Sequence, residues 1–195
     1  RKLPTVETLG AMTVVCSDKT GTLTMNEMTV KAIITADSCY RVDGNSYEPH
    51  GNIYLEGCDT AVKVQPYTVL ETYLRTIELC NDSQLIQDAL GHWGITGGPT
   101  EGALKVLAAK ANLEPLRTQL VAKIPFDSQY KYMATHFLLD EQETVMVTGA
   151  PDVLFALCQQ QQTSRGAVPF DRGYWESEMA RFASQGLRMV AAATK

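Results

Sequence analysis

The first third of the chain alternates short apolar runs with polar breaks, a pattern that predicts strands joined by turns. Residues 12–16 (MTVVC) form a nearly continuous, β-branched run, typical of a strand buried on both faces of a parallel sheet. Residues 28–34 (MTVKAII) predict a second strand. The Asp-Gly pair at 43–44, between short runs at 40–42 and 45–47, predicts the turn of a β-hairpin.

Later segments show the spacing or the end signals of helices. Residues 66–80 place apolar side chains three and four positions apart, which predicts an amphipathic helix. Pro99 introduces a second helix after a glycine-rich loop, and Pro151 opens a third, because proline is well tolerated in the first helical turn. A last helix is expected from about Asp171 to Gly186, where glycine suits a left-handed cap.

The second half also contains runs rich in β-branched and aromatic residues. They predict strands at 121–126, 131–139, 143–147 and 187–194. Adjacent strands mixed with helices favour an α+β domain over residues 31–195, with a mostly antiparallel sheet flanked by helices. The glutamine run at 159–162 is interpreted as a solvated loop.

Composition narrows the class of protein. The chain has 195 residues, 45% of them hydrophobic, which suffices for an ordinary core. Its net charge of −5 argues against a nucleic-acid partner, which would require a basic surface. Five cysteines without a C-x-x-C pair favour a reduced, cytosolic setting over a disulfide framework or a zinc site. No apolar stretch approaches the ~18 residues of a membrane span, and no signal peptide is expected.

Asp18 stands at the carboxyl end of the strand expected at 12–16, where ligands collect in open α/β sheets. An ionised aspartate can attack phosphorus and form an aspartyl phosphate, provided that Mg²⁺ and nearby donors neutralise the charge. Thr20 and Thr22 supply hydroxyls, and Gly21 lets backbone N–H groups approach an anion. The alternative from these residues alone is that Asp18 caps the following turn.

The heptad DKTGTLT at 18–24 resembles the phosphorylation motif of P-type cation-transporting ATPases, and its flanks resemble the P2-like pumps of that E1-E2 type. Four further stretches are similar to the signatures of the family's nucleotide-binding domain, in the family's order. They are GGPTEGAL (97–104), IPFDSQYKYM (124–133), TGAPDVLF (148–155) and GLRMVAAAT (186–194). The resemblance implies a nucleotide-binding domain at 31–195. It also implies that residues 1–30 form the N-terminal piece, with a hinge, of a haloacid-dehalogenase-like phosphorylation domain.

The resemblance also implies roles for single residues. Asp18 would accept the γ-phosphoryl group of ATP and contact Mg²⁺. Thr20 would bind Mg²⁺ through its carbonyl and the phosphate through its hydroxyl. Five more residues would bind the nucleotide: Glu101 lining the pocket, Phe126 stacking on adenine, Lys131 beside the nucleotide, Gly149 leaving room for it, and Arg188 reaching the phosphates.

Each nucleotide-binding residue also has a structural interpretation. Phe126 could be a core residue of its strand, and Glu101 could simply favour a helix N-terminus. Lys131 and Arg188 could be exposed cations that cover apolar surface. Taken together, an aromatic platform and two cations suit adenine and a polyphosphate.

The chain departs from the family pattern at three positions. Thr148 stands where the family usually has lysine, and Gly98 stands where it usually has an acidic residue. Many members also have an arginine near the position that Ser128 occupies in this chain. Loss of the lysine removes a cation and a long donor from the pocket, so ATP binding is expected to be weaker or differently arranged.

The implied function is ATP-driven cation transport at the cytoplasmic face of a membrane, with this chain as a soluble fragment of the pump. The acidic residues that complete the Mg²⁺ site, and the membrane helices that select the ion, would belong to the rest of the pump. One alternative is a soluble haloacid-dehalogenase-type phosphohydrolase, although Thr20 stands where such enzymes commonly place a second aspartate. Another is a nucleotide-binding or interaction module that has lost catalysis.

Overall fold

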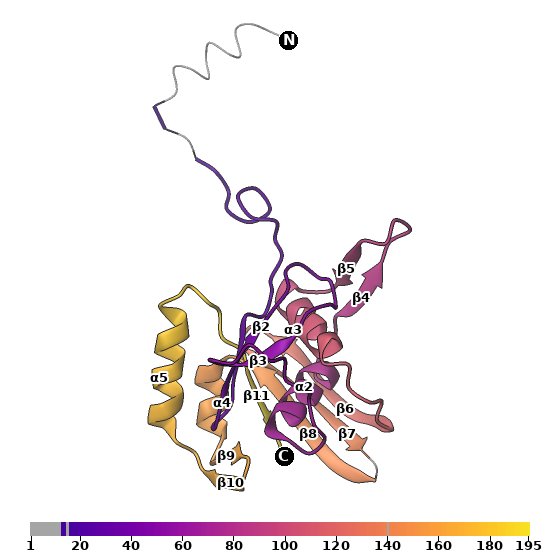
Figure 1. Cartoon of the computed structure of the whole chain (residues 1–195), viewed down its shortest axis with the longest axis vertical. Helices are drawn as coiled ribbons and strands as arrows, with labels where there is room; N and C mark the ends of the chain where they lie inside the picture. Colours follow the sequence, from indigo (N-terminus) through magenta and orange to yellow (C-terminus); the bar gives the residue numbers. More distant parts are fainter. Residues whose placement is uncertain (1–12, 15, 140) are drawn as a thin grey trace, which may run out of the picture.

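A computed structural model of the chain describes residues 13–14, 16–139 and 141–195. Its largest sheet has four antiparallel strands in the order β11-β8-β7-β6. These strands are β6 (Thr118–Asp127), β7 (Tyr132–Leu139), β8 (Gln142–Gly149) and β11 (Ala191–Thr194). The fold is therefore α+β with antiparallel sheets flanked by helices, which confirms the predicted class (Figure 1).

Within the residues that the structure describes, four helices and three smaller sheets accompany this sheet. The helices are α2 (Val69–Leu79), α3 (Pro99–Lys110), α4 (Pro151–Leu157) and α5 (Arg172–Ala183). The smaller sheets comprise β1 (Ala32–Ile34), β2 (Cys39–Val42) and β3 (Ile53–Leu55); β4 (Gln84–Gln87) and β5 (Trp93–Thr96); and β9 (Gln160–Thr163) and β10 (Gly166–Pro169). In Figure 1, α5 lies at the outer left beside α4, and the β4–β5 hairpin projects at the upper right.

The main core lies where α2 and α3 meet the β1–β2–β3 sheet. Leu74 and Ile77 of α2 are fully buried, as is Leu107 of α3. Ile33 of β1 packs in the same cluster, and Ala192 of β11 lies against it. Because residues before 69 share this core with both helices, the β1–β2–β3 sheet folds together with the segment that follows it.

A second cluster fixes α2 on the large sheet. Cys80, at the end of α2, packs with Met133 and Phe137 of β7 and with Met146 of β8. The Thr148 hydroxyl donates to the Cys80 carbonyl at 3.3 Å. The face of the sheet that carries Met133 and Thr148 is therefore the face covered by α2.

The N-terminus of α2 is held by reciprocal side-chain bonds. The Thr68 hydroxyl accepts from the Glu71 N–H at 3.2 Å, and the Glu71 carboxylate accepts from the Tyr67 N–H at 2.8 Å. These two contacts satisfy backbone donors that the helix itself leaves unpaired.

We expect Thr68→Ala to lower the free energy of unfolding by about 1 kcal/mol, because the cap at Glu71 N–H is lost. Urea unfolding followed by circular dichroism measures the change. Thr60→Ala is a suitable control, since Thr60 is exposed and lies outside the helices and strands. Equal effects of both substitutions would contradict the capping role.

Several sequence predictions are confirmed, and others are wrong in their details. The strand expected at 28–34 is only β1, because the ladder with β2 begins at Ala32, and of the residues before it only Lys31 bonds to β2, through its carbonyl and the Val42 N–H. The Asp-Gly turn does not close the expected hairpin with 45–47; β2 continues instead to β3, with Val42 paired to Ile53. In the strand expected at 12–16, Met12 and Val15 lie outside the described residues, and Thr13, Val14 and Cys16 are not in a strand. The described chain offers them no adjacent strand with which to form a ladder.

Two hairpins were not predicted. The glycine-rich region expected to be a loop contains β5, which pairs with β4. The glutamine run supplies β9, which pairs with β10 from Gln160–Pro169 to Thr163–Gly166, so it is not simply a solvated loop. The strand expected at 187–194 is limited to β11. No helix in the described part of the chain is long and apolar enough to span a membrane.

Candidate functional site

Asp18 lies in an exposed loop that leads away from the body of the fold (Figure 1). Its carboxylate accepts a hydrogen bond from the Thr20 N–H at 3.4 Å. The Leu23 and Thr24 N–H groups both donate to the Lys19 carbonyl at 3.0 Å, and Gly21 adopts a φ of +72°. The loop therefore forms a compact turn that leaves the Asp18 carboxylate open to approach.

The donors of this loop suit Mg²⁺ only together with other ligands. Mg²⁺ prefers oxygen ligands, usually one or two carboxylates with water and substrate phosphates. Asp18 offers one carboxylate, and Thr20 offers a carbonyl and a hydroxyl. Among the residues that the structure describes, no three His, Cys, Asp or Glu side chains lie close enough to hold a metal ion together. Taken alone, the loop would supply only part of a Mg²⁺ shell, and other ligands would have to complete it.

Three of the predicted nucleotide-binding residues lie around one end of the large sheet. Phe126 is near the end of β6, and Lys131 ends the turn that leads into β7. Gly149 ends β8 and pairs directly with Tyr132, the neighbour of Lys131. The Phe126 side chain is 56% exposed. It is therefore not a core residue of its strand, and a flat ligand can reach it.

The turn between β6 and β7 is ordered by its own hydrogen bonds. The Asp127 side chain accepts from the Gln129 N–H at 2.7 Å, and the Asp127 carbonyl accepts from the Lys131 N–H at 2.7 Å. Lys131 takes a left-handed φ of +58°, which asparagine or glycine would adopt more readily. Its ammonium lies 3.3 Å from Asp152, but both side chains are exposed, so this ion pair contributes little to stability.

Gly149 is required by the packing of the chain itself. A Cβ at this position would lie 2.5 Å from the Lys131 carbonyl oxygen and 2.7 Å from the Tyr132 Cα. The Ala150 N–H donates to the same carbonyl at 2.9 Å, which holds the two segments together. The close approach of the two backbones is thus a sufficient reason for glycine here.

Arg188 contacts the N-terminal turn of α3, the turn in which Glu101 lies. Arg188 Nη1 donates to the hydroxyl of Thr100, the neighbour of Glu101, at 3.4 Å. Glu101 lies in the first turn, where the helix dipole favours a carboxylate. The free backbone N–H groups at the N-terminus of α3 favour bound anions. Arg188 adds a cation beside these donors.

A polar bridge connects this helix end to the large sheet. Asn81 Nδ2 donates to the Glu101 carbonyl at 2.9 Å, and Asn81 Oδ1 accepts from the Ser83 N–H at 2.8 Å. Asp82 forms an ion pair with Lys123 of β6. The structure thus arranges the predicted residues in two groups, Phe126–Lys131–Gly149 and Glu101–Arg188, with the 81–83 loop contacting both α3 and β6.

Comparison with known proteins gives the family. The family profile described as "P-type ATPase, cytoplasmic domain N" matches residues 69–195. The chain belongs to the P-type ATPase family. It is 44% identical to the cation-transporting ATPase pma1 of Synechocystis, covering 100% of this chain and 22% of that protein. It is 41% identical to the probable cation-transporting ATPase F of Mycobacterium tuberculosis (98% and 21% covered) and 35% identical to a calcium-transporting ATPase of Bacillus subtilis (99% and 22%). The chain thus spans about a fifth of the length of these relatives.

The three residues that depart from the P-type ATPase pattern lie in different environments. Thr148 is buried on the α2 side of the sheet, where its hydroxyl bonds to the Cys80 carbonyl. A lysine at this position of the P-type ATPase fold would have to extend from that buried environment toward the sheet edge. Gly98 is the N-cap of α3 and makes no side-chain cap, and Ser128 lies in the exposed β6–β7 turn.

The sequence analysis missed three residues that link the two groups of predicted site residues: Asn81, Asp82 and Lys123. None lies within a stretch that resembles a family motif, and the Asp82–Lys123 pair joins residues distant in the chain. One local signal was available. Asn81 and Asp82 directly follow the predicted helix, where side chains commonly bond to backbone groups.

Proposed function

We propose that this chain is the ATP-binding part of a cation-transporting P-type ATPase, and that Asp18 accepts the γ-phosphoryl group of ATP. Residues 1–30 would belong to the phosphorylation domain and residues 31–195 to the nucleotide-binding domain. The observation that carries the proposal is the exposed Asp18 loop, joined within one chain to a fold that matches the family's N domain. The shared core of β1–β3 with α2 and α3 supports a domain that begins before residue 69.

In the proposed reaction, an Asp18 carboxylate oxygen attacks the γ-phosphorus and forms an acyl phosphate bond. The bond from that phosphorus to the β,γ-bridging oxygen breaks, and ADP leaves with the electron pair. Thr20 would hold the transferred group through its hydroxyl. Asp18 and the Thr20 carbonyl would hold Mg²⁺, whose contribution is to neutralise phosphate charge. Water later hydrolyses the acyl phosphate, and the cycle would drive cation movement through the rest of the pump.

Nucleotide would bind to the two groups of residues described above. The exposed Phe126 ring offers a face to adenine, and Lys131 lies at the same end of the sheet. Arg188 and the N-terminus of α3 offer donors to phosphates, and Glu101 lies in that turn. Asn26, with a left-handed φ of +56°, begins an irregular stretch before β1, which suits a hinge that brings Asp18 to the nucleotide.

This proposal is tested by titrating the chain with ATP, with and without Mg²⁺, while following amide shifts by NMR. We expect saturable shifts around Glu101, Phe126, Lys131 and Arg188. Phe126→Ala should weaken binding about tenfold, because base–aromatic stacking is worth ~1–3 kcal/mol. Lys131→Ala should weaken binding through loss of a cation.

The matched control is Leu120→Ala, which removes another exposed apolar side chain, 52% exposed, from the same strand. It should leave ATP binding unchanged. If a folded sample shows no saturable shift up to millimolar ATP, the nucleotide-binding proposal fails and an interaction module becomes the better explanation.

A further inference from the structure

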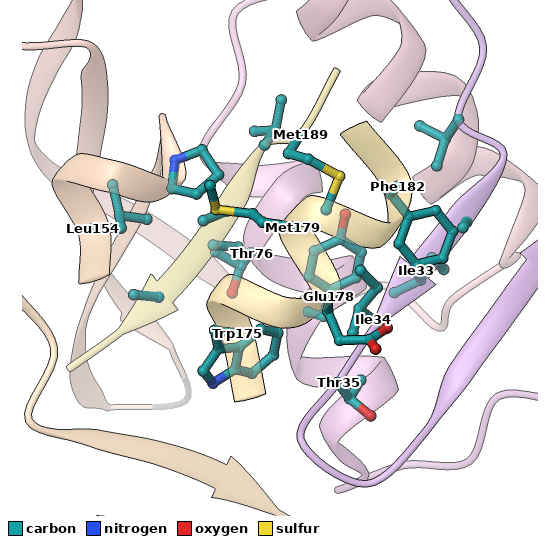
Figure 2. Close-up of a pocket in the computed structure, with 18 of the residues that line it drawn as sticks. Ile33, Ile34, Thr35, Thr76, Leu154, Trp175, Glu178, Met179, Phe182 and Met189 are labelled. Atoms are coloured by element: carbon teal, nitrogen blue, oxygen red, sulfur yellow. The ribbon is translucent and has the colours of Figure 1, made fainter. Parts of the chain in front are cut away.

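A cavity of about 570 Å³ lies between α5 and the rest of the fold (Figure 2). Its walls come from α5, α4, α2, β1 and the 186–194 segment that contains β11. Phe126, Lys131, Gly149 and Glu101 do not line it. The cavity is therefore separate from most of the proposed nucleotide site, although Arg188 takes part in both.

The inner face of α5 is apolar at helical spacing. Trp175, Met179 and Phe182 follow one another at four and three positions, so they share one face of the helix. Figure 2 shows Met179 directed toward Leu154 of α4, Phe182 beside Ile33 of β1, and Trp175 below Thr76 of α2. Protein interiors leave few voids larger than a water molecule. The volume of this cavity lies within the ~300–1,000 Å³ that is typical of small-molecule binding pockets.

Polar contacts near both ends of α5 tie this helix to the rest of the fold. The Tyr174 hydroxyl donates to the Thr35 carbonyl at 2.7 Å, and Trp175 Nε1 donates to Gln161 Oε1 at 2.9 Å. Near the other end of the helix, Arg181 donates to Glu56 at 3.1 Å. The wall is thus positioned by bonds that do not depend on filling the space behind it.

Two donors on the lining lack a strong acceptor. Burial raises the pKa of Tyr73 to about 12, so its hydroxyl stays protonated, and no described residue accepts a hydrogen bond from it. Among the described residues, Arg188 bonds only to the Thr100 hydroxyl and has no carboxylate within ion-pair distance.

The remaining charged groups of the lining include two that are already engaged. Lys31 donates to the Asn45 side chain at 2.9 Å, and Glu178 accepts from Arg181 at 2.7 Å. Glu27 and Arg188 also line the cavity, and both are exposed. Arg188 is therefore the cation of the lining that the anionic end of a ligand can reach, at the exposed part of the cavity.

We propose that this cavity binds an amphipathic monocarboxylate, with its apolar body against Trp175, Met179 and Phe182 and its carboxylate at Arg188. A carboxylate supplies acceptor oxygens to the Arg188 guanidinium, and an unbranched apolar body fills the space without requiring polar partners. Tyr73 provides a second donor to the ligand's oxygens. The proposal concerns a different ligand from ATP; because both ligands would contact Arg188, it is tested in the absence of ATP.

The test uses decanoate as the probe and Trp175 fluorescence as the signal, in a Trp93→Phe background that leaves Trp175 as the reporter. Decan-1-ol, with the same chain and no charge, is the matched ligand. We expect a saturable change with decanoate and at least tenfold weaker binding of decan-1-ol. Arg188→Gln should reduce decanoate affinity to that of the alcohol and leave alcohol binding unchanged. Arg172→Gln, at an exposed arginine paired with Glu176, should change neither.

Absence of a saturable signal below the micellar range would overturn the proposal, as would equal affinity for the acid and the alcohol.

A second readout guards against misfolding of the arginine variant. Cys158 lines the cavity, whereas Cys58 is exposed elsewhere. Decanoate should slow alkylation of Cys158 in the wild-type chain at least several-fold and leave Cys58 unaffected; equal rates with and without decanoate would contradict the site. Retained ATP shifts with no decanoate binding would refute this site alone, and the reverse result would refute only the ATP proposal.

Discussion

Replacing Asp18 by asparagine in a full-length pump that carries this chain should abolish the phosphoenzyme and lower ATP hydrolysis at least about 1,000-fold. An amide oxygen is a far weaker nucleophile than a carboxylate, and loss of the nucleophile in a covalent mechanism costs up to ~10⁶-fold. The exposed Asp18 loop makes no contact with the core, so the substitution should not unfold the chain. Acid-stable labelling from γ-labelled ATP and steady-state hydrolysis measure the two effects.

Asp59→Asn is the matched control, because Asp59 is exposed and lies outside the regular elements. It should leave labelling and hydrolysis intact. If the Asp18 variant keeps its labelling, the phosphoryl acceptor lies elsewhere. If it keeps hydrolysis without a phosphoenzyme, the chain performs a different phosphohydrolase reaction.

The isolated chain provides a complementary arm of the same experiment. Asp18 has no cluster of acidic partners among the described residues, and transfer to a carboxylate needs extensive charge neutralisation. The chain alone should therefore bind ATP without stoichiometric labelling of Asp18. Stoichiometric labelling would show that the 195 residues contain the whole transfer site.

The elements predicted well from sequence are those whose signals are local. Helix α3 begins at Pro99 and α4 at Pro151, as the preference of proline for the first turn implies. The three strands from β6 to β8 are consecutive along the chain and pair with their immediate neighbours. Neither prediction required knowledge of which distant segments meet.

The errors fall where pairing is decided by tertiary contacts. A run of glutamines has no apolar alternation, yet β9 forms because β10 and Trp175 of α5 offer it partners. β2 pairs with β3 and not with the residues just after Asp43-Gly44, which do not form a strand. The pairing with β3 is favoured because Ile53 buries an apolar side chain in the core. Thr13, Val14 and Cys16 lie beside no other strand in the described chain, and local propensity alone does not maintain a ladder.

The candidate site divides in the same way. Its motif residues were found from sequence because each lies in a recognisable stretch. The Asp82–Lys123 pair and the Asn81–Glu101 bond arise only when α2, α3 and β6 come together. Likewise, the helix from Asp171 was expected from sequence, but the space beside Trp175 depends on how several elements pack.

The last prediction separates two explanations of Gly149. An added methyl group would meet the backbone of Lys131 and Tyr132 at 2.5–2.7 Å, and backbone cannot move aside as a flexible side chain can. Gly149→Ala should therefore lower the free energy of unfolding by about 3 kcal/mol, the upper end of typical overpacking costs. Urea unfolding without nucleotide measures this directly, with the m-value expected to stay unchanged.

Gly173→Ala is the appropriate control, since its Cβ would meet only Asp171 Oδ1 at 3.5 Å, an ordinary contact. Alanine in this first turn of α5 should be neutral or stabilising by up to ~1 kcal/mol. If Gly149→Ala instead keeps wild-type stability and loses only ATP binding, the glycine serves the ligand rather than the chain. If stability falls as expected, any loss of ATP binding must be measured well below the unfolding midpoint. Only then can the β7–β8 contact be distinguished from a direct role at the nucleotide.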